Sequence, residues 1–397
     1  MLKCRFRIGH VVMEDSAVAS VLIRNTLWVT MAVHADTGCF LLCIPDICVA
    51  GYTGARSEIL ELLLPLKLYA GENQGLCAER DFKVQHGGFS EEPVENLIHI
   101  PGTRCAVTSG SSSSTLQIWD IGGDDSDVIK RTGVINLKSK SATGSKIAPG
   151  LTDEPAVLHG SCISDVELTE IATGRVLHTV AKESSDSVSG LQFVNACVFL
   201  ICTSNGTLLM GDTRAPSTCH YPLEESKSGL HWSFGLRSDR IQSEASCTVA
   251  RLSSSGHILL SDLRDLQSMF CQTQIKVQHS ASNNDFLNIS WAPVLDRCLS
   301  VSGKIAVTHQ SFFFSNLEGF DGTVHIYDTM DWSTEGQSPQ PVFSHRGHEM
   351  SHEGKHCDFP PVVTTHSWHQ SRPKTLLSAA TDGSLHVWDW VDKITDR

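Results

Sequence analysis

A six-residue pattern recurs at six places along the chain, and it constrains the fold more than any other feature of the sequence. In each copy apolar residues stand two apart, and the last position is acidic. Two copies end in Trp-Asp, as Trp119-Asp120 and Trp388-Asp389. The six copies occupy residues 115–120, 165–170, 207–212, 257–262, 323–328 and 384–389. Apolar spacing of period two predicts β-strands that bury at least one face.

Four of these strands directly follow a tight-turn pair, which predicts that each one is the second arm of a hairpin. The pairs are Asn205-Gly206, Ser255-Gly256, Asp321-Gly322 and Asp382-Gly383. Another apolar strand precedes each pair, and a third strand precedes that one, most clearly at 287–291 and 363–368. Three strands that repeat in the same order indicate an antiparallel meander.

The ends of the pattern match those of a WD repeat. A seventh, degenerate copy precedes the six at residues 47–64, and a Gly/His pair precedes each Trp-Asp end, at His86 and at His348. The interpretation is an all-β, seven-bladed WD-repeat β-propeller with four strands in each blade. We expect a buried hydrogen-bond chain to tie the strands of a blade together. The predicted structural positions are His86, Trp119, Asp120, Asp212, Asp262, Asp328, His348, Trp388 and Asp389.

The composition argues against several classes of protein. The formal net charge is −13, which disfavours direct binding of nucleic acid. Hydrophobic residues make up 41% and charged residues 19% of the chain, which predicts a large buried core rather than disorder. The 14 cysteines include no CxxC pair and indicate reduced thiols in an intracellular protein. No apolar run is long enough to span a membrane, so a soluble protein without membrane contact is expected.

The best candidate for a metal site is a polar stretch that precedes the last repeat. It contains His345, His348, His352, His356, Cys357 and Asp358. These residue types are zinc ligands, but a polar loop between blades is the favoured interpretation, and we predict no metal and no cofactor. The sequence contains no nucleophile elbow, phosphate-binding loop or H-E-x-x-H helix. We therefore predict no catalytic residues and do not expect an enzyme.

Two small charged segments are candidates for docking contacts. The basic one contains Lys138, Lys140 and Lys146, and the acidic one contains Glu91, Glu92, Asp124, Asp125 and Asp127. Solvated loops are the favoured interpretation of both. The alternative is that each attracts a partner of opposite charge.

Several longer stretches carry a closer resemblance than the repeat itself. The run DFKVQHGGFS at residues 81–90 is far more specific than a Trp-Asp pair, and the stretches 125–130, 290–293, 362–369 and 384–392 add to it. They resemble the WD repeat-containing protein 73 family, over a region from about residue 47 to the C-terminus. The resemblance implies a WD-repeat propeller at 47–397.

Two stretches depart from the family's pattern. Residues 1–46 form an atypical N-terminal segment, in which residues 26–33 are the candidate for the strand that closes the ring. Residues 304–319 are interpreted as an insertion, because their removal reduces the spacing of the acidic ends from 66 to 50 residues, as in neighbouring repeats. Translation of a retained intron is one hypothesis for their origin.

The resemblance also implies a function. Members of the family are associated with subunits 9 and 11 of the Integrator complex, which form its RNA endonuclease module. We therefore expect a non-enzymatic scaffold that stabilises this pair in the cytoplasm before nuclear import. The second expectation from the resemblance is a regulator of microtubule organisation that binds tubulin or other spindle proteins. Its sites in mitosis would be the spindle, the spindle poles and the cleavage furrow. The net charge of −13 disfavours direct contact with acidic tubulin tails.

Overall fold

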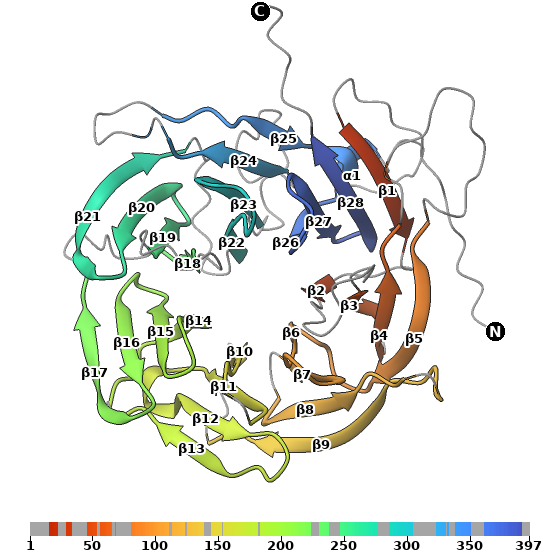
Figure 1. The fold of residues 1–397 in the computed structure, drawn as a ribbon, viewed down its shortest axis with the longest axis horizontal. Coiled ribbons are helices and arrows are strands. Elements are labelled where there is room, and N and C mark those ends of the chain that lie inside the picture. The colour runs from red at the N-terminus through yellow and green to blue at the C-terminus, as the bar shows by residue number, and fades with distance from the viewer. Residues whose placement is uncertain are drawn as a thin grey trace, which may run out of the picture.

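Seven four-stranded antiparallel sheets surround a central axis in the computed structural model (Figure 1). The structure describes residues 16–22, 29–33, 46–53, 56–65, 68, 81–110, 113–123, 125–138, 144–152, 154–181, 183–223, 230–237, 247–275, 286–304, 323–330, 332, 338–350 and 361–390. In these residues the helical elements are a 3₁₀ turn, η2 (Ile163–Asp165), and the short α1 (Gly347–Met350). The prediction of an all-β, seven-bladed propeller is confirmed.

The blades are numbered here in chain order, each from its inner to its outer strand. Blade 1 contains β2 (Val29–Val33), β3 (Asp46–Thr53), β4 (Arg56–Leu63) and β5 (Lys83–Ser90). Blade 2 contains β6 (Asn96–His99), β7 (Cys105–Ser109), β8 (Thr115–Asp120) and β9 (Lys130–Asn136). Blade 3 contains β10 (Lys146–Pro149), β11 (Ala156–Gly160), β12 (Glu167–Glu170) and β13 (Val176–Thr179). Blade 4 contains β14 (Val188–Phe193), β15 (Val198–Thr203), β16 (Leu208–Asp212) and β17 (Ala215–Tyr221).

Blade 5 contains β18 (Trp232–Leu236), β19 (Thr248–Ser253), β20 (His257–Asp262) and β21 (Asp265–Gln274). Blade 6 contains β22 (Phe286–Trp291), β23 (Cys298–Lys304), β24 (Val324–Asp328) and β25 (Phe343–His345). Blade 7 contains β26 (Val363–Trp368), β27 (Thr375–Ala380), β28 (Ser384–Trp390) and, as its outer strand, β1 (Ser16–Leu22). All six predicted copies of the repeat become third strands of blades.

Glycine occupies the tight turns of the hairpins between second and third strands, as the turn pairs predict. Gly206, Gly256 and Gly383 adopt φ values of +85°, +83° and +80°, a region that side chains with a Cβ rarely enter. The pair Asp321-Gly322 lies outside the described residues, as do residues 305–319 of the predicted insertion.

The ring is closed by a different strand from the one predicted. Strand β1 pairs with β28 in antiparallel register, from Ser16 opposite Trp390 to Leu22 opposite Ser384. The prediction that residues 26–33 close the ring is wrong, because Val29–Val33 form β2, which pairs with β3 as the inner strand of blade 1. Both segments carry apolar residues, and apolar content alone does not say which sheet a strand joins. The first 46 residues thus supply strands to two blades.

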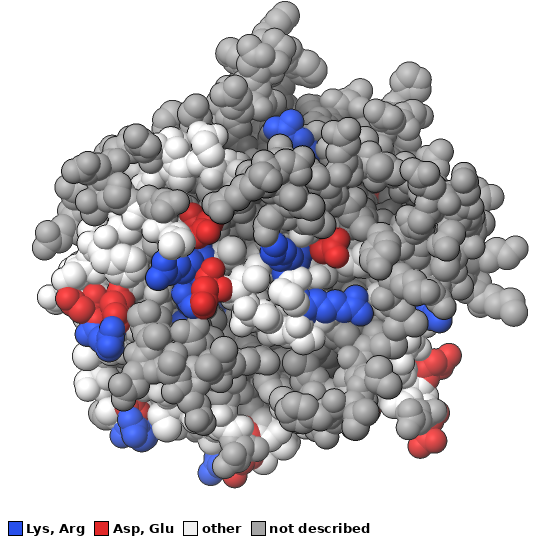
Figure 2. Space-filling view, turned by 45° about the horizontal axis from the view of Figure 1, so that its top comes forward, with Lys and Arg blue, Asp and Glu red and all other residues white. Residues whose placement is uncertain are grey.

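Many exposed charges of the described residues stand in local pairs of opposite sign, and blue and red side chains are mixed on the face seen in Figure 2. Arg214 pairs with Asp212 at 2.6 Å, and Arg264 pairs with Asp262 at the same distance. Arg175 lies 3.4 Å from Glu170. None of the described helices has the length and apolar character needed to cross a membrane.

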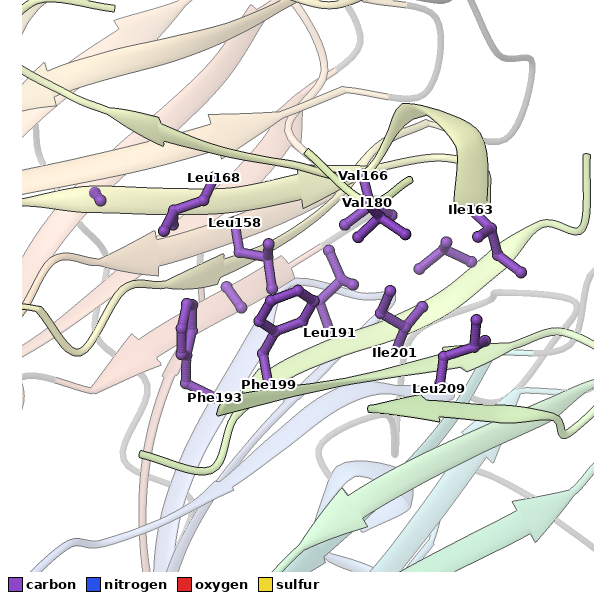
Figure 3. Close-up of a cluster of buried hydrophobic side chains, with 13 residues drawn as sticks. Leu158, Ile163, Val166, Leu168, Val180, Leu191, Phe193, Phe199, Ile201 and Leu209 are labelled. Carbon is purple, nitrogen blue, oxygen red and sulfur yellow. The ribbon is translucent and has the colours of Figure 1, made fainter. Parts of the chain in front are cut away.

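The core consists of apolar layers between neighbouring blades. Figure 3 shows one layer, in which Leu158 of blade 3 faces Leu191, Phe199 and Ile201 of blade 4. Leu200, which lies between Phe199 and Ile201 on β15, points to the other face of that sheet and packs against blade 5. Middle strands are therefore buried on both faces, which explains their nearly continuous apolar sequences.

Candidate functional site

Blade 7 holds a continuous chain of buried hydrogen bonds that includes two of the predicted positions, Trp388 and His348. The Trp388 Nε1–H donates to Ser378 Oγ at 3.1 Å, and Ser378 Oγ lies 2.8 Å from His348 Nε2. On the other side of the His348 imidazole, Nδ1 lies 2.6 Å from Ser384 Oγ, which donates to Asp382 Oδ1 at 2.6 Å. The chain links α1, β27, β28 and the turn between those strands.

The proton positions along this chain follow from its donors. Because Ser384 donates its single hydroxyl proton to Asp382, it can only accept from His348 Nδ1, which leaves His348 Nε2 to accept from Ser378. His348 therefore carries its proton on Nδ1 and donates it to Ser384. Burial, with a smaller contribution from neighbouring His345, lowers the pKa of His348 well below its ordinary value. A neutral His348 satisfies every polar atom from Trp388 to Ser384, as a buried network requires.

Two further buried histidines, His345 and His386, lie beside His348. His345 Nε2 lies 3.2 Å from His386 Nδ1, and the rings of His348 and His386 stack with centroids 3.9 Å apart. One nitrogen from each of the three rings lies within 4.8 Å of the others, a spacing that could hold a metal ion. However, serine hydroxyls engage both nitrogens of His348. Burial also lowers the pKa of His345 and of His386 well below the ordinary value.

The candidate metal set is thus brought together only in part. His345 and His348 are neighbours, and His386, which sequence reasoning missed, completes the cluster. His352, His356, Cys357 and Asp358 lie outside the described residues. These hydrogen bonds fit neutral histidines that brace the blade, and none of them requires an ion. Alternation along β28 places His386 on the same face as Trp388, but it gave no sign that His386 would face other histidines.

The two Gly/His positions have different surroundings. In blade 2, Trp119 Nε1 donates to Thr108 Oγ1 at 2.9 Å, much as Trp388 donates to Ser378 in blade 7. His86 does not join that contact. Its Nδ1 faces the carboxylate of Glu61, and its Nε2 lies 3.3 Å from the carbonyl oxygen of Gly123. His86 therefore bridges blades 1 and 2 instead of extending the tryptophan network.

Glu61 is the centre of an ionic clamp between blades 1 and 2 that the sequence did not reveal. Arg104 donates through Nη1 and Nη2 to the two carboxylate oxygens at 2.7 and 2.8 Å, and through Nε to the Gly122 carbonyl at 2.8 Å. Burial acts to raise the pKa of Glu61, but the hydrogen bonds from Arg104 and His86 together hold it below its ordinary value. The only sequence signal was a glutamate inside the apolar run Ile59–Leu64.

The predicted aspartates lie at the ends of third strands, where they shape the following turn. Asp120 Oδ1 accepts the Gly122 N–H at 3.0 Å, and Asp328 Oδ1 accepts the Met330 N–H at 2.9 Å. Asp212 and Asp262 make the same bond to the residue two positions on, and each also binds the arginine there. The hydrogen bonds from Arg214 lower the pKa of Asp212 to about 2. Asp389 is half-buried at the equivalent place in β28. These aspartates stabilise turns, while Asp382 supplies the carboxylate of the blade 7 network.

The candidate docking segments also separate. Lys138 pairs with Glu167 at 2.5 Å, and burial lowers the pKa of Lys146, so these two lysines do not form a free basic patch. Lys140 and Asp124 lie outside the described residues. Glu91, Glu92, Asp125 and Asp127 are exposed. The described residues of the acidic candidate are exposed, whereas Lys138 is exposed but paired and Lys146 is partly buried.

Comparison with known proteins places the chain in a family. No protein-family model matches it. It is 80% identical to "Integrator complex assembly factor WDR73" of Danio rerio over 353 residues, which cover 89% of each chain. It is 40% identical to the Xenopus laevis protein of that name, over 87% of this chain and 90% of the relative. The Homo sapiens protein is 38% identical, over 88% of this chain and 90% of the relative. The chain belongs to the WDR73 family of WD-repeat proteins.

Proposed function

We propose that this protein is a non-enzymatic scaffold that assists assembly of the Integrator complex. The observation that carries the proposal is the 80% identity, over 89% of both chains, to a relative named as an Integrator complex assembly factor. A ring of seven blades presents loops and outer strands on a rigid body, which suits a protein that holds others in a fixed geometry. The buried polar groups described above are engaged within the fold, which is consistent with a structural role.

The more specific part of the proposal concerns the partner and the place. We propose that the chain binds subunits 9 and 11, the RNA endonuclease module, in the cytoplasm before nuclear import. Support comes from the family resemblance. A net charge of −13 suits association with a partner surface of positive charge, because complementary charge speeds encounter.

A role in binding microtubules receives no support from the described surface. Tubulin tails are acidic, so they require a surface of free cations. Arg214, Arg264, Arg175 and Lys138 are paired with carboxylates, and the exposed Lys83, Lys130 and Arg131 belong to a chain with a net charge of −13. Tubulin is therefore kept as an outcome of the experiment below.

The experiment combines affinity purification with reconstitution. Tagged full-length chain is recovered from cytosol at low and high salt, and purified chain is then mixed with purified subunits 9 and 11 and separated by size. We expect near-stoichiometric recovery of both subunits and co-elution of the purified proteins. Recovery of tubulin that persists in salt, without the two subunits, would contradict the proposal. A chain that lacks residues 304–319 is tested in parallel. If the shortened chain captures the partners and the full-length chain does not, the insertion prevents binding.

A further inference from the structure

The outer edge of blade 1 is extended by a segment of blade 2. Gly87 of β5 donates its N–H to the Asp127 carbonyl at 3.0 Å, and its own carbonyl accepts the Ile129 N–H at 2.9 Å. These bonds form a parallel bridge between Gly87 and Val128. Residues 127–129 therefore lie alongside β5 on the rim of the ring, where β5 is the outer strand in Figure 1.

The two faces of this extended sheet differ sharply. On one face, Ile59 of β4 and Ile129 are buried, and a Cβ on Gly88 would lie only 2.5 Å from the Ile129 carbonyl. This face packs against blade 2, and Ile59 and Ile129 share a core cluster there. The alternate residues, Gly87 and Val128, must point to the opposite face because side chains alternate along a strand.

On that opposite face, an apolar notch forms around Gly87. Leu60 of β4 stands directly opposite Gly87, and Glu58 stands opposite Phe89. Leu60 takes the place that a side chain on Gly87 would occupy, because a Cβ on Gly87 would come within 3.3 Å of Leu60 Cδ2. Phe89 is 51% exposed and Val128 is 45% exposed. We call Leu60, Gly87, Phe89 and Val128 together the notch, in which Leu60 is partly buried while Phe89 and Val128 are exposed.

Carboxylates from two separate segments gather beside the notch. Glu91 and Glu92 follow Phe89 after the buried Ser90, while Asp125 and Asp127 precede Val128, and all four are exposed. Glu58 adds a fifth carboxylate, opposite Phe89. The exposed cations nearest in the chain are Lys83, at the far end of β5, and Lys130 and Arg131, beyond Val128. Among the residues whose side chains the structure describes, acidic groups outnumber basic ones in the segments next to the notch, on a chain with a net charge of −13.

We propose that this notch is a docking site for a segment of a partner protein in which an apolar side chain is flanked by lysine or arginine. The apolar side chain would pack against Leu60, Phe89 and Val128, and the flanking cations would meet the two acidic segments. In a typical interface, a few buried apolar side chains supply most of the binding energy, and polar or charged residues form the rim around them. A second copy of this chain is not the occupant proposed, because its equal negative charge would repel the rim. The inference rests on the proposed function, since it names the surface through which that function would act.

The first test measures affinity for purified Integrator subunits 9 and 11. The variant Phe89→Glu places a like charge in the notch and is expected to weaken binding about tenfold or more, a loss of at least ~1.4 kcal/mol. Double replacement Glu91→Lys with Glu92→Lys is expected to weaken binding at low salt and to reduce its dependence on salt. The matched control is Phe270→Glu, because Phe270 is 56% exposed on β21, the outer strand of blade 5. It should leave the affinity within about twofold of wild type.

The results separate the two proposals. If the wild-type chain binds the pair and Phe89→Glu binds equally well, the notch is excluded as the docking site and the proposed function stands. Each variant is checked for an unchanged melting temperature. If Phe89→Glu is destabilised, Phe89→Thr, which keeps strand propensity, replaces it.

If the wild-type chain does not bind the pair, the proposed function fails and a second experiment judges the notch. A photo-reactive phenylalanine analogue is placed at position 89 or at position 270, and cross-linked peptides are identified from extract. A cross-link at position 89 alone, to one defined segment rich in lysine or arginine and competed by free wild-type chain but not by Phe89→Glu, supports the site. Absence of such a cross-link overturns it.

Discussion

At the scale of single residues, Ser378 is the position on which blade 7 depends most. Its hydroxyl accepts from Trp388 and donates to His348. Ser378→Ala leaves both partners buried and unsatisfied, at about 1–3 kcal/mol each. We therefore expect the free energy of unfolding in urea to fall by about 2–6 kcal/mol. The control Ser268→Ala, at an exposed position of β21, should change it by less than about 0.5 kcal/mol. A loss no larger than that of the control would contradict the network.

His366 gives a prediction for pH. Ser300 and Ser302 hydroxyls lie 2.8 and 2.7 Å from its two nitrogens, and burial lowers the pKa of His366 to about 3. The unfolded value is about 6.5, so between these limits the unfolded chain binds a proton that the folded chain does not. His366 thus makes the free energy of unfolding fall by about 1.4 kcal/mol for each pH unit below about 6.5.

The variant His366→Gln should remove this contribution. Urea unfolding between about pH 6 and pH 4 is expected to show a slope shallower than wild type by about 1.4 kcal/mol per pH unit. His220→Gln is the control, because His220 is exposed on β17. An unchanged slope in His366→Gln would show that His366 is protonated in the folded protein.

At the scale of elements, the connection between β23 and β24 is much longer than the equivalent connections in blades 4, 5 and 7. Equivalent second-to-third connections are residues 204–207, 254–256 and 381–383, whereas β23 ends at Lys304 and β24 begins at Val324. Deletion of 304–319 would join Gly303 to the sequence Phe320-Asp321-Gly322-Thr323, and so restore a short Asp-Gly turn. The interpretation of these residues as an insertion stays a prediction.

We expect the shortened chain to melt at the same or a higher temperature, since closing a shorter loop costs less entropy. It should also scatter less light on heating, because the apolar run at residues 312–314 is removed. A version in which Gly and Ser replace 305–319 at equal length separates the two effects, and should correct the aggregation alone. A deletion that fails to fold would show that these residues belong to the blade.

The elements that sequence reasoning found and those that it missed differ in the range of the contacts that define them. Third strands such as Leu208–Asp212 were predictable because alternation, turn glycine and acidic end all lie within a few residues. The roles of Glu61 and His386 were not predictable, because their partners come from distant segments. In the sequence of a strand, a buried glutamate cannot be distinguished from an exposed one. The notch has the same origin, since the pairing of β4 with β5 places Leu60 beside Gly87, and a bridge to blade 2 adds Val128.

At the scale of the whole molecule, one strand decides whether the ring is closed. β1 forms seven register pairs with β28, although the two strands lie at opposite ends of the sequence. Without β1, the edge of β28 would carry unpaired backbone groups, and such an edge pairs readily with other chains. At about 0.5–1.5 kcal/mol for each backbone hydrogen bond, loss of the ladder should cost about 5 kcal/mol.

Deletion of residues 1–22 is therefore expected to lower the melting temperature and to produce aggregates that scatter light. A synthetic peptide of residues 16–22, added in excess, should reverse both effects in part, because it restores the β28 pairing. The control peptide carries Ala19→Pro together with Ser20→Pro. Successive N–H groups of a strand point to opposite sides, so one of the two prolines must remove a bond to β28. Equal rescue by both peptides, or full stability of the truncated chain, would show that the ring closes without this strand.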